Sequence, residues 1–169
     1  PPIEPPSRAI KVGVIQDTAF QFYYPENLEA LQLHGAELIA INALEDKRLP
    51  ELDGLYIGGG FPETSAARLA ENDSFRQSVK DAAAAGLPIY AECGGLMYLG
   101  RSIQTLEGRS YPMVGLLPHD FLMGQSPQGH GYTVLEVEGS NPYFPSGTRL
   151  KGHEFHYSKL SRSGGVETV

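Results

Sequence analysis

The sequence predicts an α/β fold with a largely parallel sheet, helices on both faces, and added antiparallel strands. Over residues 11–99, short apolar segments alternate with helical segments, which is typical of parallel strands joined by helices. Over residues 100–160, strand-like pieces are separated by turns rich in Gly, Pro and Ser, which favours antiparallel or mixed pairing. The 169 residues are 41% hydrophobic and 20% charged, as expected for one globular domain with its own core.

The expected elements of the first hundred residues follow from local signals. The strands are Lys11–Ile15, Leu38–Ile41, Leu52–Ile57 and Pro88–Ala91. The helices are Pro25–His34, Glu63–Ala70, Asp73–Ala85, and one that begins near Leu96. Pro25 suits a first helical turn, and Gly35 and Gly86 stand just beyond two helix ends. The polar and aromatic segment Gln16–Tyr24 is expected to be a loop at the carboxyl end of the first strand.

The remaining segments complete the expected organisation. The later strand-like pieces are Ser102–Leu106, Met113–Leu117, Tyr132–Val137 and Leu150–Tyr157. Residues 1–10 are rich in Pro and are expected to be a linker, because Pro can neither donate to a sheet nor continue a helix. Residues 11–169 then form the domain, and a domain that opens on a linker is expected to be part of a longer protein.

Composition excludes several kinds of partner. The net charge of −7 and the absence of a basic run argue against nucleic acid. No apolar run has the length of a membrane span and no signal-peptide pattern opens the sequence, so no membrane association is expected. The single cysteine rules out an internal disulfide and suits the reducing cytoplasm, where we expect the protein. No cluster of residues has the spacing of a metal site.

Cys93 lies between the fourth expected strand and the next helix, at the carboxyl end of the predicted sheet. Gly94 and Gly95 follow it and permit a tight bend or the close approach of a ligand. A side chain at such a strand-to-helix elbow is held out of the core, and the helix N-terminus favours a thiolate and an oxyanion. A lone cysteine is also commonly a small buried hydrophobe. The nucleophile interpretation therefore requires a base and an oxyanion hole elsewhere in the chain.

Gly58–Gly60 follow the third expected strand at the same edge of the sheet. The sequence after them has neither the Lys-Ser/Thr of a phosphate loop nor the G-x-G-x-x-G of a dinucleotide site. Two interpretations remain. The glycines form a tight turn between strand and helix, or their backbone N–H groups donate hydrogen bonds to a developing oxyanion.

The base must come from five histidines. Three of them have the context of surface or loop residues: His34, His119 and His130. If Leu150–Tyr157 is a strand, alternation places Glu154 and His156 on one face and His153 on the other. A carboxylate and an imidazole on the same face favour His156 as the base and Glu154 as its partner.

Four segments resemble one protein family, in the same order along the chain. They are Phe20–Asn27, Tyr56–Glu63, Tyr90–Leu99 and Gly152–Ser158. These motifs look like the carboxy-terminal glutaminase domain of cobyrinic acid a,c-diamide synthases, which resembles the class I (triad) glutamine amidotransferases in the branch shared with cobyric acid synthase. The resemblance spans residues 12–160 and implies a flavodoxin-like class I glutamine amidotransferase fold.

The resemblance also implies a reaction. Cys93 would attack the side-chain amide of glutamine, and His156 would take the thiol proton and return it to the leaving ammonia, with Glu154 as a candidate third member of the triad. The oxyanion and substrate would be bound by Gly59, Gly60 and Gly94. Ammonia would pass to an amino-terminal ATP-using domain of a two-domain synthase, which activates carboxylates of a corrin. ATP and Mg belong to that domain, and no cofactor is implied for this one.

Departures from the family pattern leave several questions open. Relatives commonly place Glu two residues after the base, where this chain has Ser158, so a Cys–His dyad is an alternative to a triad. The segment Phe121–Gly131 is basic in relatives and here contains Gln125, Gln128 and His130. The acid that accepts the ammonia is also left open, because a sirohydrochlorin-type macrocycle is an alternative to the corrin. Two interpretations without glutamine hydrolysis also stay open: a DJ-1-like cysteine-elbow protein and a catalytically silent interaction module.

Overall fold

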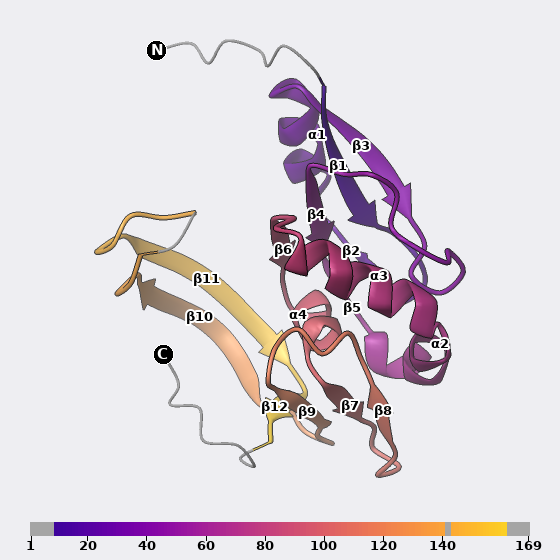
Figure 1. Ribbon diagram of the computed structural model, residues 1–169. Coiled ribbons are helices and arrows are strands. Elements are labelled where there is room, and N and C mark those ends of the chain that lie inside the picture. Colours follow the sequence, from indigo (N-terminus) through magenta and orange to yellow (C-terminus); the bar gives the residue numbers. More distant parts are fainter. Residues whose placement is uncertain (1–8, 141–142, 162–169) are drawn as a thin grey trace.

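The computed structural model describes residues 9–140 and 143–161 (Figure 1). Its strands are β1 (Ile10–Ile15), β2 (Phe20–Phe22), β3 (Ala36–Ile41), β4 (Gly54–Ile57), β5 (Gly59–Gly60), β6 (Ile89–Ala91), β7 (Ser102–Gln104), β8 (Ser110–Pro112), β9 (Asp120–Met123), β10 (Gly129–Glu136), β11 (Arg149–His156) and β12 (Ser158–Leu160). Its helices are α1 (Pro25–Leu33), α2 (Ala66–Glu71), α3 (Asp73–Ala84) and α4 (Gly94–Leu99), with a 3-10 turn η1 (Pro62–Ser65).

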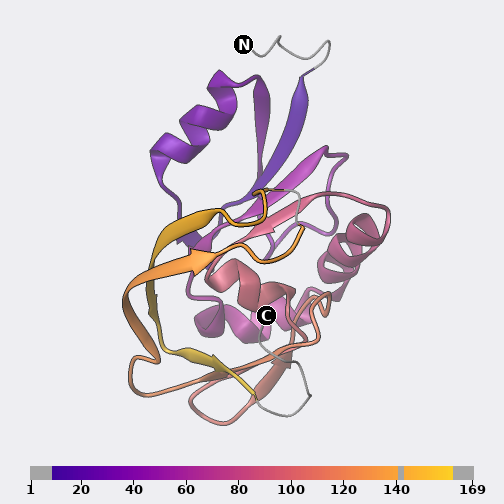
Figure 2. The same ribbon diagram turned by 90° about the vertical axis from the view of Figure 1, so that its left-hand side faces the viewer.

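A parallel sheet forms the centre of the fold, with the strand order β3-β1-β4-β6. Figure 2 shows α1 on one side of this sheet and α3 on the other. The predicted α/β class, with a parallel sheet and helices on both faces, is therefore confirmed. Because the strands are parallel, the carboxyl ends of β1, β4 and β6 meet at one edge, where ligands commonly bind in such sheets.

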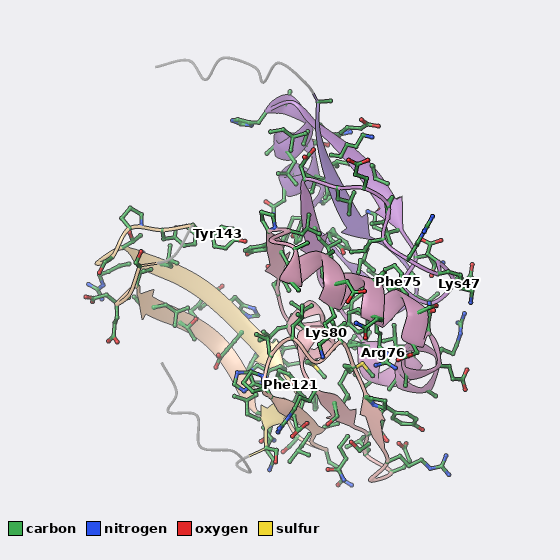
Figure 3. The ribbon with its side chains drawn as sticks, viewed as in Figure 1. Lys47, Phe75, Arg76, Lys80, Phe121 and Tyr143 are labelled. Carbon is green, nitrogen blue, oxygen red and sulfur yellow. The ribbon has the colours of Figure 1, made fainter. Side chains whose placement is uncertain are left out.

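The two long helices cover the sheet to different extents. Helix α3 buries Phe75, labelled in Figure 3, and Val79 completely, one turn apart on the face toward the core. It ends before Gly86, whose φ of 95° is a conformation that favours glycine. Helix α1 begins with Pro25 in its first turn but buries none of its residues. The main core therefore lies between the sheet and the α3 side.

Two further groups of strands follow the parallel sheet. A four-stranded sheet has the order β12-β9-β7-β8, in which β7 and β9 are parallel and the other pairs antiparallel. Strands β10 and β11 form a separate antiparallel ribbon (Figure 1). The segment between them returns to the parallel sheet, because the Tyr143 hydroxyl donates to the Ile89 carbonyl at 3.2 Å and its ring lies 5.7 Å from that of Tyr90 (Figure 3). The added antiparallel strands are thus confirmed.

Several predicted boundaries differ from the structure. Gln16–Tyr24 is not entirely a loop, because Phe20–Phe22 pairs with Gly59–Gly60 as β2 and β5. The strand expected at Met113–Leu117 does not form, and β8 lies just before it. The helix expected at Glu63–Ala70 divides into η1 and α2. The strands β9 and β12 are absent from the sequence-based set, because strands of three or four residues depend on distant partners more than on their own pattern. Residues 1–8 of the expected linker lie outside the described residues.

Candidate active site

Cys93 forms a sharp elbow between β6 and α4, with φ 51° and ψ −115°. Among the described residues it is the one non-glycine residue with a positive φ. Such a conformation costs on the order of 1–3 kcal/mol and persists only where surrounding contacts impose it. The thiol is exposed, so the alternative of a buried structural cysteine is wrong. A strained elbow that presents an exposed side chain is the arrangement known from nucleophile elbows.

Backbone hydrogen bonds on both sides of Cys93 hold the elbow. The Glu92 N–H donates to the Ile57 carbonyl at 3.1 Å, which continues the pairing of β6 with β4. The Gly95 N–H lies 2.9 Å from the Glu92 carbonyl and 3.1 Å from the Gly58 carbonyl. A Cβ at Gly95 would lie 2.4 Å from the Ile57 carbonyl oxygen, so only glycine permits this approach. The turn is thereby fixed to the end of β4.

The glycine segment after β4 lies directly beside the elbow. Gly59 and Gly60 form β5, so the interpretation as a simple strand-to-helix turn is replaced by a short antiparallel pair with β2. A Cβ built on Gly59 would lie 3.5 Å from the Cys93 Cβ, and one on Gly94 would lie 3.1 Å from the Gly60 nitrogen. Gly59, Gly60, Cys93 and Gly94 are therefore neighbours. Backbone N–H groups beside an exposed thiol are the components of an oxyanion hole.

Glu154 and His156 occupy one face of the β10–β11 ribbon, as strand alternation predicts. A Cβ on Gly129 would lie 2.4 Å from the His156 Nε2 and 2.8 Å from the Glu154 Oε1. The two side chains are separated by 4.0 Å between Nε2 and Oε2, which is beyond a hydrogen bond. His153 lies on the opposite face, where its ring centroid is 5.6 Å from that of Tyr132.

The tautomer of His156 follows from its second ring nitrogen. Nδ1 lies 2.7 Å from the Ser158 carbonyl oxygen. A carbonyl only accepts, so Nδ1 carries the hydrogen and Nε2 of the neutral ring has the free lone pair. Within the described part of the chain, no hydrogen bond or ion pair joins His156 to Cys93. The structure thus forms two halves of the predicted site, one at the elbow and one on the ribbon.

Two tyrosines beside the elbow were missed by the sequence reasoning. The Tyr56 hydroxyl donates to the Glu92 Oε1 at 2.6 Å, immediately before the cysteine. The Tyr23 hydroxyl accepts the Gly58 N–H at 2.8 Å and donates to the Ile15 carbonyl. Burial raises the pKa of Tyr23 to about 12, and burial together with the Glu92 carboxylate raises the pKa of Tyr56. The aromatic run after the first strand was the only available signal, and it does not say which tyrosine faces the glycines.

A cavity of about 480 Å³ lies between α1 and the parallel sheet, and Tyr56 is part of its lining. It is lined by Val12, Asn27, Ala30, Leu31, His34, Gly54, Leu55, Tyr56, Pro88, Tyr90 and Tyr143. Cys93 is not part of this lining, so the candidate nucleophile lies outside the cavity, at the edge of the sheet.

The described residues contain no group of three or more side chains able to hold a metal ion, and no helix among them is long and apolar enough to cross a membrane.

The fold and the elbow define an α/β protein with an exposed, backbone-strained cysteine at the carboxyl edge of a parallel sheet. Solved structures share the fold. PurLQS from Thermotoga maritima superposes with a TM-score of 0.62 at 18% sequence identity, and the match covers 94% of this chain and 72% of that one. A glutamine amidotransferase from the same organism gives a TM-score of 0.60 at 14% identity, over 91% of this chain and 63% of that one.

Sequence similarity is more specific than the shared fold. The chain belongs to the family of CobB/CobQ-like glutamine amidotransferase domains, which it matches over residues 11–169. It is 49% identical over 154 residues to the cobyrinate a,c-diamide synthase of Caldanaerobacter subterraneus subsp. tengcongensis, covering 90% of this chain and 34% of that protein. The chain therefore spans about a third of the length of this relative. Membership of the family removes the DJ-1-like alternative.

Gly60→Ala is expected to destabilise the protein strongly, because the added Cβ would lie 2.0 Å from the backbone carbonyl oxygen of Ala19, the residue just before β2. Overpacking of this kind costs roughly 1–3 kcal/mol, and backbone that cannot move aside places the effect at the upper end. Urea unfolding measures the loss. Gly139→Ala is the matched control, since no described atom beyond its chain neighbours lies within 4 Å of its Cβ position, and it should leave the midpoint nearly unchanged. Equal midpoints for the two variants would contradict this packing.

Proposed function

We propose that this chain is the glutamine-hydrolysing domain of a synthase that amidates corrin carboxylates, as in cobyrinate a,c-diamide synthases. The observation that carries the proposal is the strained, exposed Cys93 beside the backbone of Gly59 and Gly60. Family membership identifies the reaction class, and the 49% identical relative has the corresponding name. The substrate of this domain is then glutamine, and its products are glutamate and ammonia.

The proposed reaction has two stages. The Cys93 thiolate adds to the side-chain amide carbon of glutamine, and the resulting oxyanion accepts hydrogen bonds from backbone N–H groups among Gly59, Gly60 and Gly94. The carbon–nitrogen bond then breaks, and the nitrogen leaves as ammonia with the proton that the base had taken from the thiol. Water attacks the γ-glutamyl thioester in the second stage, releasing glutamate and restoring the thiolate.

His156 is the proposed base, acting through Nε2. This assignment is supported by the Nδ1 hydrogen bond to the Ser158 carbonyl, which leaves the Nε2 lone pair available. The same bond gives the ring the orientation that a third acid supplies in a triad. Glu154 lies toward Nε2, so its proposed part is to stabilise the imidazolium that forms when the proton arrives, not to orient the neutral ring. A Cys–His dyad with a backbone carbonyl as the orienting group is the simplest description.

The ammonia is proposed to pass to an ATP-using part of the synthase, where a phosphorylated corrin carboxylate consumes it. ATP and Mg would bind in that part. The chain's span of about a third of its relative supports such a division. No cofactor, nucleic acid or membrane is proposed for this domain, and the cytoplasm is its proposed location.

Glutamate release by the complete synthase tests the proposal. We expect release to rise when ATP, Mg and cobyrinic acid are added together, because hydrolysis without an acceptor would waste glutamine, and the isolated chain is expected to turn over slowly. Stimulation by sirohydrochlorin and not by cobyrinic acid would change the acceptor and keep the glutaminase. Release no faster than that of Cys93→Ala under every condition would contradict the enzyme and favour a silent interaction module.

A further inference from the structure

We propose that Tyr23 is a positioning residue that holds the glycine segment 58–60 in the orientation required for oxyanion binding. The inference rests on the proposed glutaminase function and gives a role in it to Tyr23, a residue of the Phe20–Asn27 motif to which the sequence analysis assigned none. Tyr23 lies in the segment between β2 and α1, far from Cys93 in the sequence. Its hydroxyl nevertheless reaches the backbone that borders the nucleophile.

The hydroxyl uses both of its hydrogen-bonding functions. It donates its hydrogen to the Ile15 carbonyl at the end of β1, and it accepts the Gly58 N–H at 2.8 Å. A hydroxyl that donates to a carbonyl has its oxygen lone pairs left to accept, so the two bonds are compatible. Tyr23 therefore ties the glycine segment to the end of the neighbouring parallel strand.

The peptide groups on both sides of Gly58 are fixed by this arrangement. In the peptide that precedes it, the Ile57 carbonyl accepts the Glu92 N–H at 3.1 Å and the Gly58 N–H is held by Tyr23. In the peptide that follows it, the Gly58 carbonyl accepts the Gly95 N–H at 3.1 Å. The Tyr23 hydroxyl is the one side-chain group in this set. Removing it frees one end of a peptide whose other hydrogen bond comes from Glu92 at the elbow.

Packing of the ring adds to the constraint. A Cβ on Gly58 would lie 2.6 Å from the Tyr23 Cε1, so the ring lies directly on the glycine backbone. The ring also meets Tyr56 edge to face, with centroids 5.1 Å apart, and Tyr56 in turn donates to Glu92 beside the nucleophile. The glycine segment and the elbow are thus braced by neighbouring tyrosines. Because burial raises the pKa of Tyr23 to about 12, the hydroxyl keeps its hydrogen at neutral pH.

The chemistry of the site explains why such a brace is needed. Glycine peptides rotate with little steric cost, so an unbraced glycine segment samples orientations in which its N–H groups point away from the reacting atom. Oxyanion stabilisation depends on donors that are already oriented when charge develops. A brace therefore acts in the transition state and leaves the binding of neutral glutamine largely unchanged.

Tyr23→Phe in the complete synthase tests the inference, with Tyr24→Phe as the matched control. Tyr24 is the next residue, is 73% exposed, and makes no described hydrogen bond through its hydroxyl. We expect Tyr23→Phe to lower kcat for glutamine hydrolysis roughly tenfold or more with little change in KM, the signature of an interaction made in the transition state. Alkylation of Cys93 by iodoacetamide needs no oxyanion hole and should keep its wild-type rate. Tyr24→Phe should match the wild type in every measurement.

The outcomes separate this inference from the proposed function. If the wild type itself does not hydrolyse glutamine, the proposed function fails. If the wild type is active and Tyr23→Phe has the same kcat, the positioning role is wrong. It is also wrong if Tyr23→Phe lowers the melting temperature and leaves kcat unchanged. Should Tyr23→Phe not fold, site-specific 3,5-difluorotyrosine at position 23 retains the ring and hydroxyl but ionises at lower pH. Loss of the proton removes the donation to Ile15, so kcat should gain an alkaline decline that the wild type lacks. An unchanged pH profile would overturn the role.

Discussion

A diazo ketone analogue of glutamine is expected to add a single adduct to Cys93, and Cys93→Ala is expected to abolish glutamine hydrolysis. The thiol is exposed at a backbone-strained elbow, and the Gly59 backbone lies near its Cβ, so an electrophile that imitates glutamine is expected to meet the sulfur together with the proposed oxyanion donors. Removal of the nucleophile leaves no path through the thioester, and the expected loss is roughly 10⁴-fold or more.

Intact-mass analysis before and after labelling measures this result. The sequence contains one cysteine, so a thiol adduct can form only at Cys93. Excess glutamine should slow labelling by the diazo ketone, because both compounds compete for the same thiol. Cys93→Ala keeps the Cβ and therefore the elbow, and its circular dichroism spectrum should match the wild type. An adduct of equal yield on Cys93→Ala would show that the nucleophile is a different residue.

His156→Ala is expected to lose glutaminase activity while His153→Ala retains most of it. The register of β10 with β11 places these side chains on opposite faces of the ribbon, and only the His156 face carries the Glu154 carboxylate. Loss of a general base typically costs on the order of 10²–10⁴ in rate. His153→Ala is a closely matched control, because His153 is an exposed histidine and His156 a half-buried histidine of the same strand. Steady-state glutamate release by the complete synthase is the measurement.

Glu154→Gln distinguishes the role of the acid from that of the base. Its carboxylate lies 4.0 Å from Nε2 and does not hold the ring, so the loss should be smaller than that of His156→Ala. A loss equal to that of His156→Ala would make Glu154 a full member of a triad. Activity retained by His156→Ala and lost by His153→Ala would instead mean that the opposite face of β11 meets the nucleophile.

Several features of this protein follow from local sequence patterns and are predictable without a structure. The parallel sheet follows from apolar runs separated by helices with Pro at the start and Gly at the end, because those signals act within a few residues. The elbow at Cys93 follows in the same way from a short strand and a Cys-Gly-Gly turn. The faces of β11 follow from alternation alone, since a strand has a side-chain period of two.

Other features were decided by contacts between segments distant in the sequence. The pairing of β2 with β5 is possible because Gly60 has no Cβ to collide with the Ala19 carbonyl, a relation between positions about forty residues apart. The His156 tautomer depends on the Ser158 carbonyl turning back toward the ring at the bend between β11 and β12.

The two adjacent tyrosines show the same limit most clearly. The sequence by itself determined that an aromatic segment follows the first strand at the edge where Cys93 lies, because strand order and turn signals are local properties. Only the tertiary structure decided that Tyr23 and not Tyr24 reaches Gly58, since that choice depends on where the end of β4 lies beside β1. Hydrogen-bond partners of a loop side chain are set by the packing of whole strands, and no local pattern encodes them.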